Sequence, residues 1–234
     1  MKNSIFNSMA VAALMVLPTL LNAAESTPSI RLNNDAEYQA ALDALLNAPP
    51  LEPALPRDRY IYLFKLGSAE AQMRHYDRAA ACVQKIVDLY PTWSIAHDTL
   101  SVFLGKAAKY KEAAAEAQKA IDLDPARAMH PNLVLASWEW HLGKKEEALK
   151  RISAIAVPET EMEKRSYYGC LACFYASVGD ETKIADAIQK SLDMDPGKTF
   201  RSFLERDIVL DAYRGKDWFI KLVGKTLLDD APQK

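Results

Sequence analysis

The stretch TWSIAHDTLSVFLGKAAKYKEAAAEAQKAIDLDP, residues Thr92–Pro125, has the pattern of two helices joined by a turn. Pro91 precedes the stretch and Pro125 closes it, so the two prolines are 125 − 91 = 34 residues apart. A single pair of helices cannot bury its own apolar stripe, and a helical pair that recurs at a fixed period indicates stacked repeats. The stretch therefore predicts an all-α chain built from units of about this length.

Four segments align on one frame when position 1 is set at Tyr60, Ser94, Met129 and Arg165, which are 34, 35 and 36 residues apart in turn. Position 7 of the frame is always leucine, in residues Leu66, Leu100, Leu135 and Leu171. Position 8 is always small, in residues Gly67, Ser101, Ala136 and Ala172. Position 20 carries residues Ala79, Ala113, Ala148 and Ile184. Small residues at positions 8 and 20 allow paired helices to approach closely, while the leucine fills the space beside them.

The leucines, small residues and closing prolines resemble the tetratricopeptide repeat (TPR) family over roughly residues 60–196. The first two units carry the resemblance best. The third unit ends early at Pro158, the fourth has Ile184 at a small-residue position, and no unit has tryptophan at position 4. The resemblance implies a right-handed superhelical solenoid of about four helix-turn-helix units, with helical caps at both ends.

The expected units cover residues 58–91, 92–125, 126–158 and 161–196. Each unit should hold two helices, over residues 58–74 and 76–89, 93–108 and 109–123, 131–142 and 144–155, 161–178 and 181–192.

The N-terminus has the features of a secretory signal peptide over residues 1–24. Lys2 supplies a positive start, Met9–Leu21 is mostly apolar, and Asn22-Ala23-Ala24 offers small residues for cleavage. The apolar run falls short of the roughly 20 residues of a spanning helix, although an uncleaved anchor is the alternative. The chain is therefore expected to be exported, to the periplasm, with no stable membrane insertion after cleavage.

Two segments flank the expected array. Residues 25–57 should form a helix followed by an extended, proline-rich linker that starts at Pro49. Residues 197–228 are expected to form capping helices, because Asp207–Leu222 is similar to the closing segment of many bacterial arrays of the TPR family. Residues 229–234 should be a frayed tail.

Composition and motifs argue against several classes of function. A formal net charge of −2 gives no support for nucleic-acid binding. The sequence has no G-x-S-x-G, Walker A, G-x-G-x-x-G or H-E-x-x-H motif, so we predict no enzyme activity, no cofactor and no metal.

Cys170-Leu-Ala-Cys173 is the sharpest short motif. In an exported protein a C-x-x-C spacing suggests a redox pair, but both cysteines fall in mid-helix rather than in a strand-turn-helix context. The alternative is that both are small apolar residues packed against a neighbour. Cys82 is a third cysteine, expected to be buried.

The four histidines do not have the spacing of metal ligands, so surface or helix-capping positions are expected for His75, His97, His130 and His141.

In the TPR family, the concave wall is lined by positions 2, 5, 6, 9, 12 and 13 of each first helix. By this resemblance, the candidate residues for protein binding are Phe64, Lys65, Asp98, Val102, Leu133, Val134, Trp140 and His141. The aromatic residues among them could anchor a peptide or could pack between repeats instead.

The resulting hypothesis is a non-catalytic scaffold or assembly factor that binds a protein or peptide segment in its concave groove. One alternative is a thiol-dependent role through Cys170 and Cys173, and another is a subunit of an envelope complex that binds through its convex face.

Overall fold

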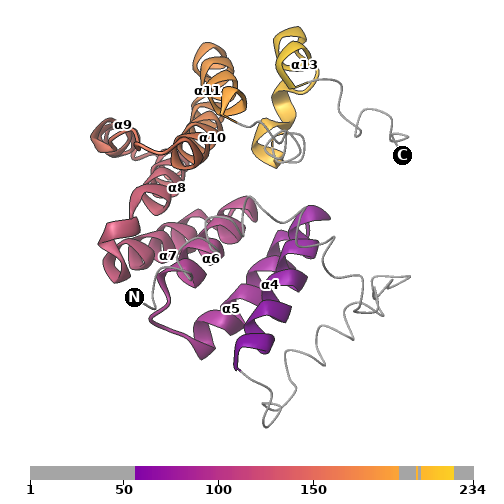
Figure 1. Ribbon diagram of the computed structural model, residues 1–234, viewed down its shortest axis with the longest axis vertical. Coiled ribbons are helices and arrows are strands. Elements are labelled where there is room, and N and C mark those ends of the chain that lie inside the picture. Colours follow the sequence, from indigo (N-terminus) through magenta and orange to yellow (C-terminus); the bar gives the residue numbers. More distant parts are fainter. Residues whose placement is uncertain (1–55, 195–203, 205–206, 224–234) are drawn as a thin grey trace. The chain divides into compact units, whose positions relative to one another are not determined.

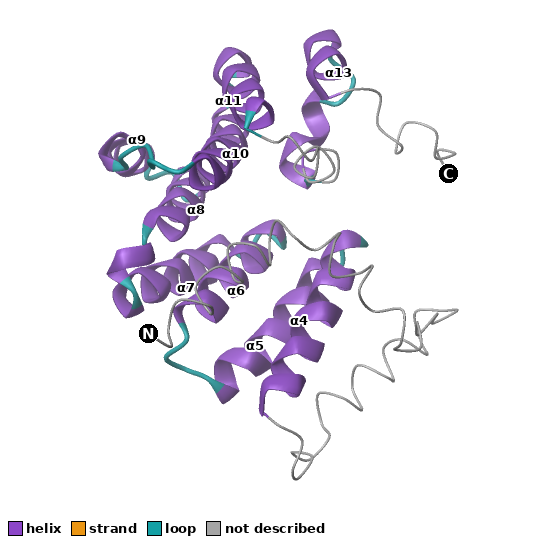
Figure 2. Ribbon diagram, viewed as in Figure 1, coloured by secondary structure: helices purple, strands orange, loops and turns teal. Residues whose placement is uncertain are grey.

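The computed structural model describes residues 56–194, 204 and 207–223 (Figure 1). Every regular element in these residues is a helix and none is a strand, which confirms the all-α prediction (Figure 2). The chain divides into two compact units, residues 1–91 and 92–234. The predicted signal peptide, N-terminal helix and C-terminal tail lie outside the described residues, as do residues 49–55 of the predicted linker.

Four helical hairpins account for most of the described chain. In the first unit the pair is α4 (Pro56–Gln72) and α5 (Tyr76–Leu89). In the second unit the pairs are α6 (Ser94–Lys106) with α7 (Tyr110–Leu123), α8 (Met129–His141) with α9 (Lys145–Ala154), and α10 (Glu161–Val178) with α11 (Glu181–Asp193). These bounds agree with the expected ones to within about two residues, the usual scatter of helix ends. One difference is that Pro56 and Arg57, expected in the linker, begin α4.

The four hairpin turns repeat the same backbone geometry. Each turn has one residue with a positive φ, and these residues are Arg74, Ala108, Gly143 and Gly179. Their separations are 108 − 74 = 34, 143 − 108 = 35 and 179 − 143 = 36, the same steps as in the sequence frame. The residue after each one donates its N–H to a carbonyl five residues back, as in Lys109 to Leu104 (2.9 Å) and Lys144 to Glu139 (2.9 Å). This bond closes a helix with a Schellman-type turn. The backbone conformation of the turns therefore repeats at the same steps as the sequence frame.

Helices α6 and α8 approach closely at Gly105. A Cβ atom added to this glycine would lie 2.2 Å from a ring carbon of Trp138, well inside van der Waals contact. The Trp138 indole is buried, and its Nε1 donates a hydrogen bond to the Ser101 hydroxyl (3.0 Å). Trp138 therefore belongs to the core.

A second contact region joins α8, α9 and α10. Phe174 is fully buried there against Ala136 and Ala148, the small residues at positions 8 and 20 of the third repeat in the sequence frame. Trp140 packs against this cluster, with its ring centroid 6.2 Å from that of Phe174. The small residues therefore leave the space that the Phe174 ring occupies.

The C-terminal segment packs against the last hairpin. It contains the 3-10 helix η2 (Ile208–Tyr213), which contacts α10, and α13 (Asp217–Val223), which contacts α11. The Tyr213 hydroxyl donates to the Ala176 carbonyl (3.1 Å), and the Trp218 indole donates to the Glu181 carboxylate (2.9 Å). These bonds hold the segment in place beside the polar residues described below.

Candidate functional site

A cluster of three ionisable side chains joins the first helices of three successive hairpins in the second unit. Asp98 lies on α6, His130 on α8 and Cys170 on α10. His130 Nδ1 lies 2.7 Å from Asp98 Oδ2, and the Cys170 thiol is one of the groups that raise the pKa of His130. We call these three residues the Asp98–His130–Cys170 cluster.

The cluster is enclosed without being sealed from solvent. The side chains of His130 and Asp98 are 17% and 15% exposed, and Cys170 is half-buried. Burial lowers the pKa of His130, but the Asp98 carboxylate and the Cys170 thiol outweigh it, so the pKa lies well above its ordinary value. The Asp98 carboxylate therefore favours the charged form of the His130 imidazole. Asp98 Oδ1 is buried with no hydrogen-bond partner, which leaves half of this carboxylate unsatisfied.

A second charged pair, Lys106 with Asp207, lies beside Cys173, which is one helical turn from Cys170 on α10. Cys173 Sγ lies 3.8 Å from Asp207 Oδ2, and the same oxygen is 3.0 Å from Lys106 Nζ. Asp207 is nearly fully buried, and its other oxygen accepts the Val209 N–H at the start of η2 (3.1 Å). Burial and the Asp207 carboxylate raise the pKa of Cys173 well above its ordinary value. The two cysteines on α10 therefore have different electrostatic surroundings.

The raised pKa of His130 gives a stability prediction with a defined sign. A raised folded-state pKa means that the stabilisation is fully present below the ordinary value of 6.5 and is lost as the pH rises through the folded-state pKa. Replacing His130 by glutamine should therefore lower the free energy of unfolding by about 2 kcal/mol at pH 6, because Asp98 loses a charged partner. The difference between parent and variant should shrink at pH 9. Urea unfolding at the two pH values measures it.

His141 supplies a control of opposite sign for that measurement. Although the residue is exposed, one face of its ring stacks on Tyr110, with centroids 4.4 Å apart. Partial burial lowers the pKa of His141, so the parent should gain stability over a His141→Gln variant as the pH rises from the lowered folded-state pKa to the ordinary value of 6.5. Equal pH dependence of stability in the His130→Gln and His141→Gln variants would contradict the opposite pKa shifts of the two histidines.

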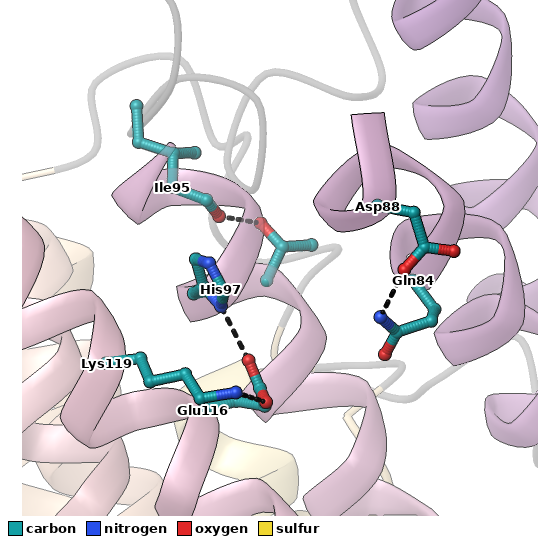
Figure 3. A network of polar contacts seen from close by, with 7 residues as sticks. Gln84, Asp88, Ile95, His97, Glu116 and Lys119 are labelled. Carbon is teal, nitrogen blue, oxygen red and sulfur yellow. Dashed lines mark hydrogen bonds and ion pairs between the residues drawn. The ribbon is translucent and has the colours of Figure 1, made fainter. Parts of the chain in front are cut away.

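The expected surface or capping positions are wrong for two histidines. His97 is buried, and its Nδ1 lies 2.6 Å from Glu116 Oε2. His130 is mostly buried beside Asp98. Figure 3 shows Glu116 reaching His97 on one side and Lys119 on the other. Burial opposes the charge on Glu116, but the bonds from Lys119 and His97 prevail and lower its pKa. This second pair links α6 with α7. His75 precedes α5 and bonds with Glu70 (3.0 Å).

The structure places the predicted wall residues in several environments. Val102, Leu133 and Val134 are buried in the second unit, and Trp140 is half-buried against the Phe174 cluster with Lys145 Nζ 5.1 Å from its ring centroid. In the first unit, Phe64 is half-buried edge-on to Tyr60, and Lys65 is exposed. Of the predicted residues, Asp98 enters the cluster directly, and so does Cys170.

All three cysteines are free thiols. Cys82 is fully buried in the first unit, where desolvation and Glu70 raise its pKa to about 12. Within the described residues, no group of three or more His, Cys, Asp and Glu side chains is arranged to hold a metal ion. None of the described helices combines the length and apolar character needed to cross a membrane.

No model of a known protein family matches this sequence, and no characterised protein matches it significantly.

Two members of the site were missed by the sequence reasoning. The sequence predicts only a surface or capping position for His130, and it identifies Asp207 only as the start of a closing segment. The repeat frame did carry a signal for His130: it stands at position 2, while Asp98 and Cys170 stand at positions 5 and 6 of the adjacent units. Adjacent repeats bring such positions close together in space.

Proposed function

We propose that this chain is a TPR-type repeat protein that binds a protein or peptide segment without catalysing a reaction. The proposed architecture is a right-handed superhelical solenoid, and the proposed location is the periplasm. The repeated turn geometry, at the same 34, 35 and 36-residue steps as the sequence frame, supports the assignment. The proposed binding surface is the wall on α6, α8 and α10, in the second unit.

The observation that carries the binding proposal is the placement of charged pairs on this wall. Asp98 of α6 pairs with His130 of α8, and Lys106 of α6 pairs with Asp207 of the C-terminal segment, so each pair includes at least one residue from the helices of the proposed wall. Apolar residues of similar size would often stabilise a fold as well as or better than buried ion pairs do. Charges that packing does not require are expected at functional sites. Both signs of charge on one wall suit a polar, extended segment with its own donors and acceptors.

The test compares capture of a partner by the parent and by a variant of the wall. The Asp98→Asn/His130→Gln double variant removes the pair without leaving a single buried charge. The matched control is His97→Gln/Glu116→Gln, which removes the similar pair between α6 and α7. Each protein would be crosslinked and co-purified from cells that produce it, after circular dichroism has shown equal helix content.

A partner captured by the parent and by the control, but lost by the wall variant, would support the proposal. Equal capture by all three would place the binding site elsewhere, as the convex-face alternative predicts. No partner for any of them would contradict the scaffold role and would leave the thiol-dependent role as the remaining hypothesis.

A further inference from the structure

We propose that the C-terminal segment is an autoinhibitory strap on the wall where the partner is proposed to bind. The strap is residues 207–223, which include η2 and α13. The inference rests on the proposed function, because it concerns how access to the same wall is regulated. The Asp207 side chain holds the strap against α6 and α10, and the strap must leave the wall before a partner segment can occupy it.

The strap contacts the first and the last helix of the proposed wall. Asp207 Oδ2 lies 3.0 Å from Lys106 Nζ on α6 and 3.8 Å from Cys173 Sγ on α10. The Tyr213 hydroxyl donates to the Ala176 carbonyl of α10 at 3.1 Å. The contacted residues Lys106, Cys173 and Ala176 stand at positions 13, 9 and 12 of the repeat frame, which are among the positions that the TPR resemblance assigns to the concave wall. The strap therefore covers part of the surface that a partner would need.

Asp207 is the residue on which closure of the strap depends. Its Oδ1 accepts the Val209 N–H at 3.1 Å, and its backbone carbonyl accepts a hydrogen bond from Arg214 Nη2 at 2.9 Å, so the carboxylate is held in one position. The side chain is only 2% exposed, and Lys106 supplies a positive charge against it. Removing one partner of a buried ion pair costs far more than replacing both partners with uncharged groups. Loss of this pair should therefore release the strap.

An equilibrium between a closed and an open strap sets the apparent affinity of the wall. If the strap is open in about one molecule in a hundred, a partner that binds only the open form has an apparent dissociation constant about a hundredfold above its intrinsic value. A change that raises the open fraction should raise partner capture by the same factor, until the strap is mostly open. A segment that only caps the last hairpin would not behave in this way, because its release would not increase binding.

Three variants alter the ion pair with different expected effects. Lys106→Met leaves the buried Asp207 carboxylate without this cation and should raise the open fraction about a hundredfold. Asp207→Asn keeps a side chain that can accept the N–H at the start of η2, and should raise the open fraction about tenfold. The Lys106→Met/Asp207→Asn double variant leaves neither charge unpaired, so the strap should close again to near the parent level.

The matched control is Glu181→Gln, which alters contacts of the same strap that lie on α11. Glu181 accepts a hydrogen bond from Trp218 at 2.9 Å and pairs with Lys216 at 3.1 Å, and both partners belong to the strap. The ion pair is exposed, and glutamine can still accept from the indole. This variant should change the open fraction by less than about threefold.

Hydrogen–deuterium exchange of the full-length proteins measures the open fraction, because the amides of the strap exchange when it leaves α10 and α11. The amides of α7 serve as an internal reference and should exchange equally in all the proteins. Crosslinking and co-purification from the cells that produce each protein measures partner capture. We expect strap exchange and capture to rise together in both single variants and to fall together in the double variant. A direct contribution of either side chain to partner binding would not be restored by the second substitution.

Each alternative outcome contradicts a defined part of the proposal. Unchanged strap exchange in Lys106→Met would show that the ion pair does not hold the strap. Faster strap exchange with unchanged or lower capture would overturn the inhibitory role and leave the strap as a structural cap. If Lys106→Met also speeds exchange of α7, the whole unit has loosened, and Asp207→Asn with the double variant decides instead. A strap that opens as expected, with no partner captured by any protein, would contradict the proposed function and the inhibitory role with it.

Discussion

Replacing Gly105 by alanine is expected to destabilise the second unit by about 3 kcal/mol, even though alanine is the better helix former. In an exposed helix this change would stabilise by about 1 kcal/mol. Here the new Cβ would meet three ring carbons of Trp138 at 2.2, 2.4 and 2.5 Å. The ring is buried and its Nε1 is bonded to Ser101, so it cannot move aside without losing that bond. The steric cost therefore exceeds the gain in helix propensity.

Urea unfolding followed by tryptophan fluorescence measures this effect, because all four tryptophans of the chain lie in the second unit. Gln118→Ala, at an exposed position of α7, serves as the control and should change stability by less than about 0.5 kcal/mol. In a Trp138→Leu background, Gly105→Ala should cost much less, because the obstructing ring is gone. An unchanged or increased stability of Gly105→Ala in the parent would contradict the close approach of α6 and α8.

Replacing Phe174 by alanine is expected to cost about 3–5 kcal/mol, a large part of the stability of a typical domain. Phe174 is fully buried on α10 and fills the space left by Ala136 of α8 and Ala148 of α9. The substitution would leave a cavity at the point where three helices meet. It would also remove the edge-on ring that supports Trp140.

A Phe174→Leu variant provides an intermediate comparison, because leucine leaves a smaller cavity and should lower the free energy of unfolding markedly less. Thermal unfolding by circular dichroism should give the order parent, leucine variant, alanine variant from most to least stable. If alanine and leucine were equally tolerated, Phe174 would not be a central contact between the last two hairpins.

The repeat frame predicted the helices well because helix pairing depends on residues within one unit. Small residues at positions 8 and 20 determine where helices approach, and Ala136 and Ala148 do so around Phe174. The frame also anticipates the turns, although Ala108 has a positive φ without being glycine. Bonds formed across a turn act locally and can compensate for such a residue.

The site could be predicted only in part, because its contacts join different helical hairpins of the second compact unit. The hydrogen-bond partner of His130 is Asp98, 130 − 98 = 32 residues away, and only the repeat frame relates the two positions. The contact of Lys106 with Asp207 spans 101 residues and depends on where the C-terminal segment packs. Burial of Leu133 and Val134 likewise follows from three-dimensional packing, since their helix is apolar on most sides. Sequence spacing alone cannot determine which side of such a helix remains accessible.

The most direct test of the binding proposal is site-specific photo-crosslinking from the wall. A photoreactive amino acid would replace Ser177, which lies one turn beyond Cys173 on α10, and in a second protein would replace the exposed Lys150 on α9. Both proteins would be illuminated in the cells that produce them. We expect a crosslinked protein partner from position 177 that competes with added unlabelled protein, and none from position 150. The same partner from position 150, with none from position 177, would contradict the assignment of the binding surface to α6, α8 and α10.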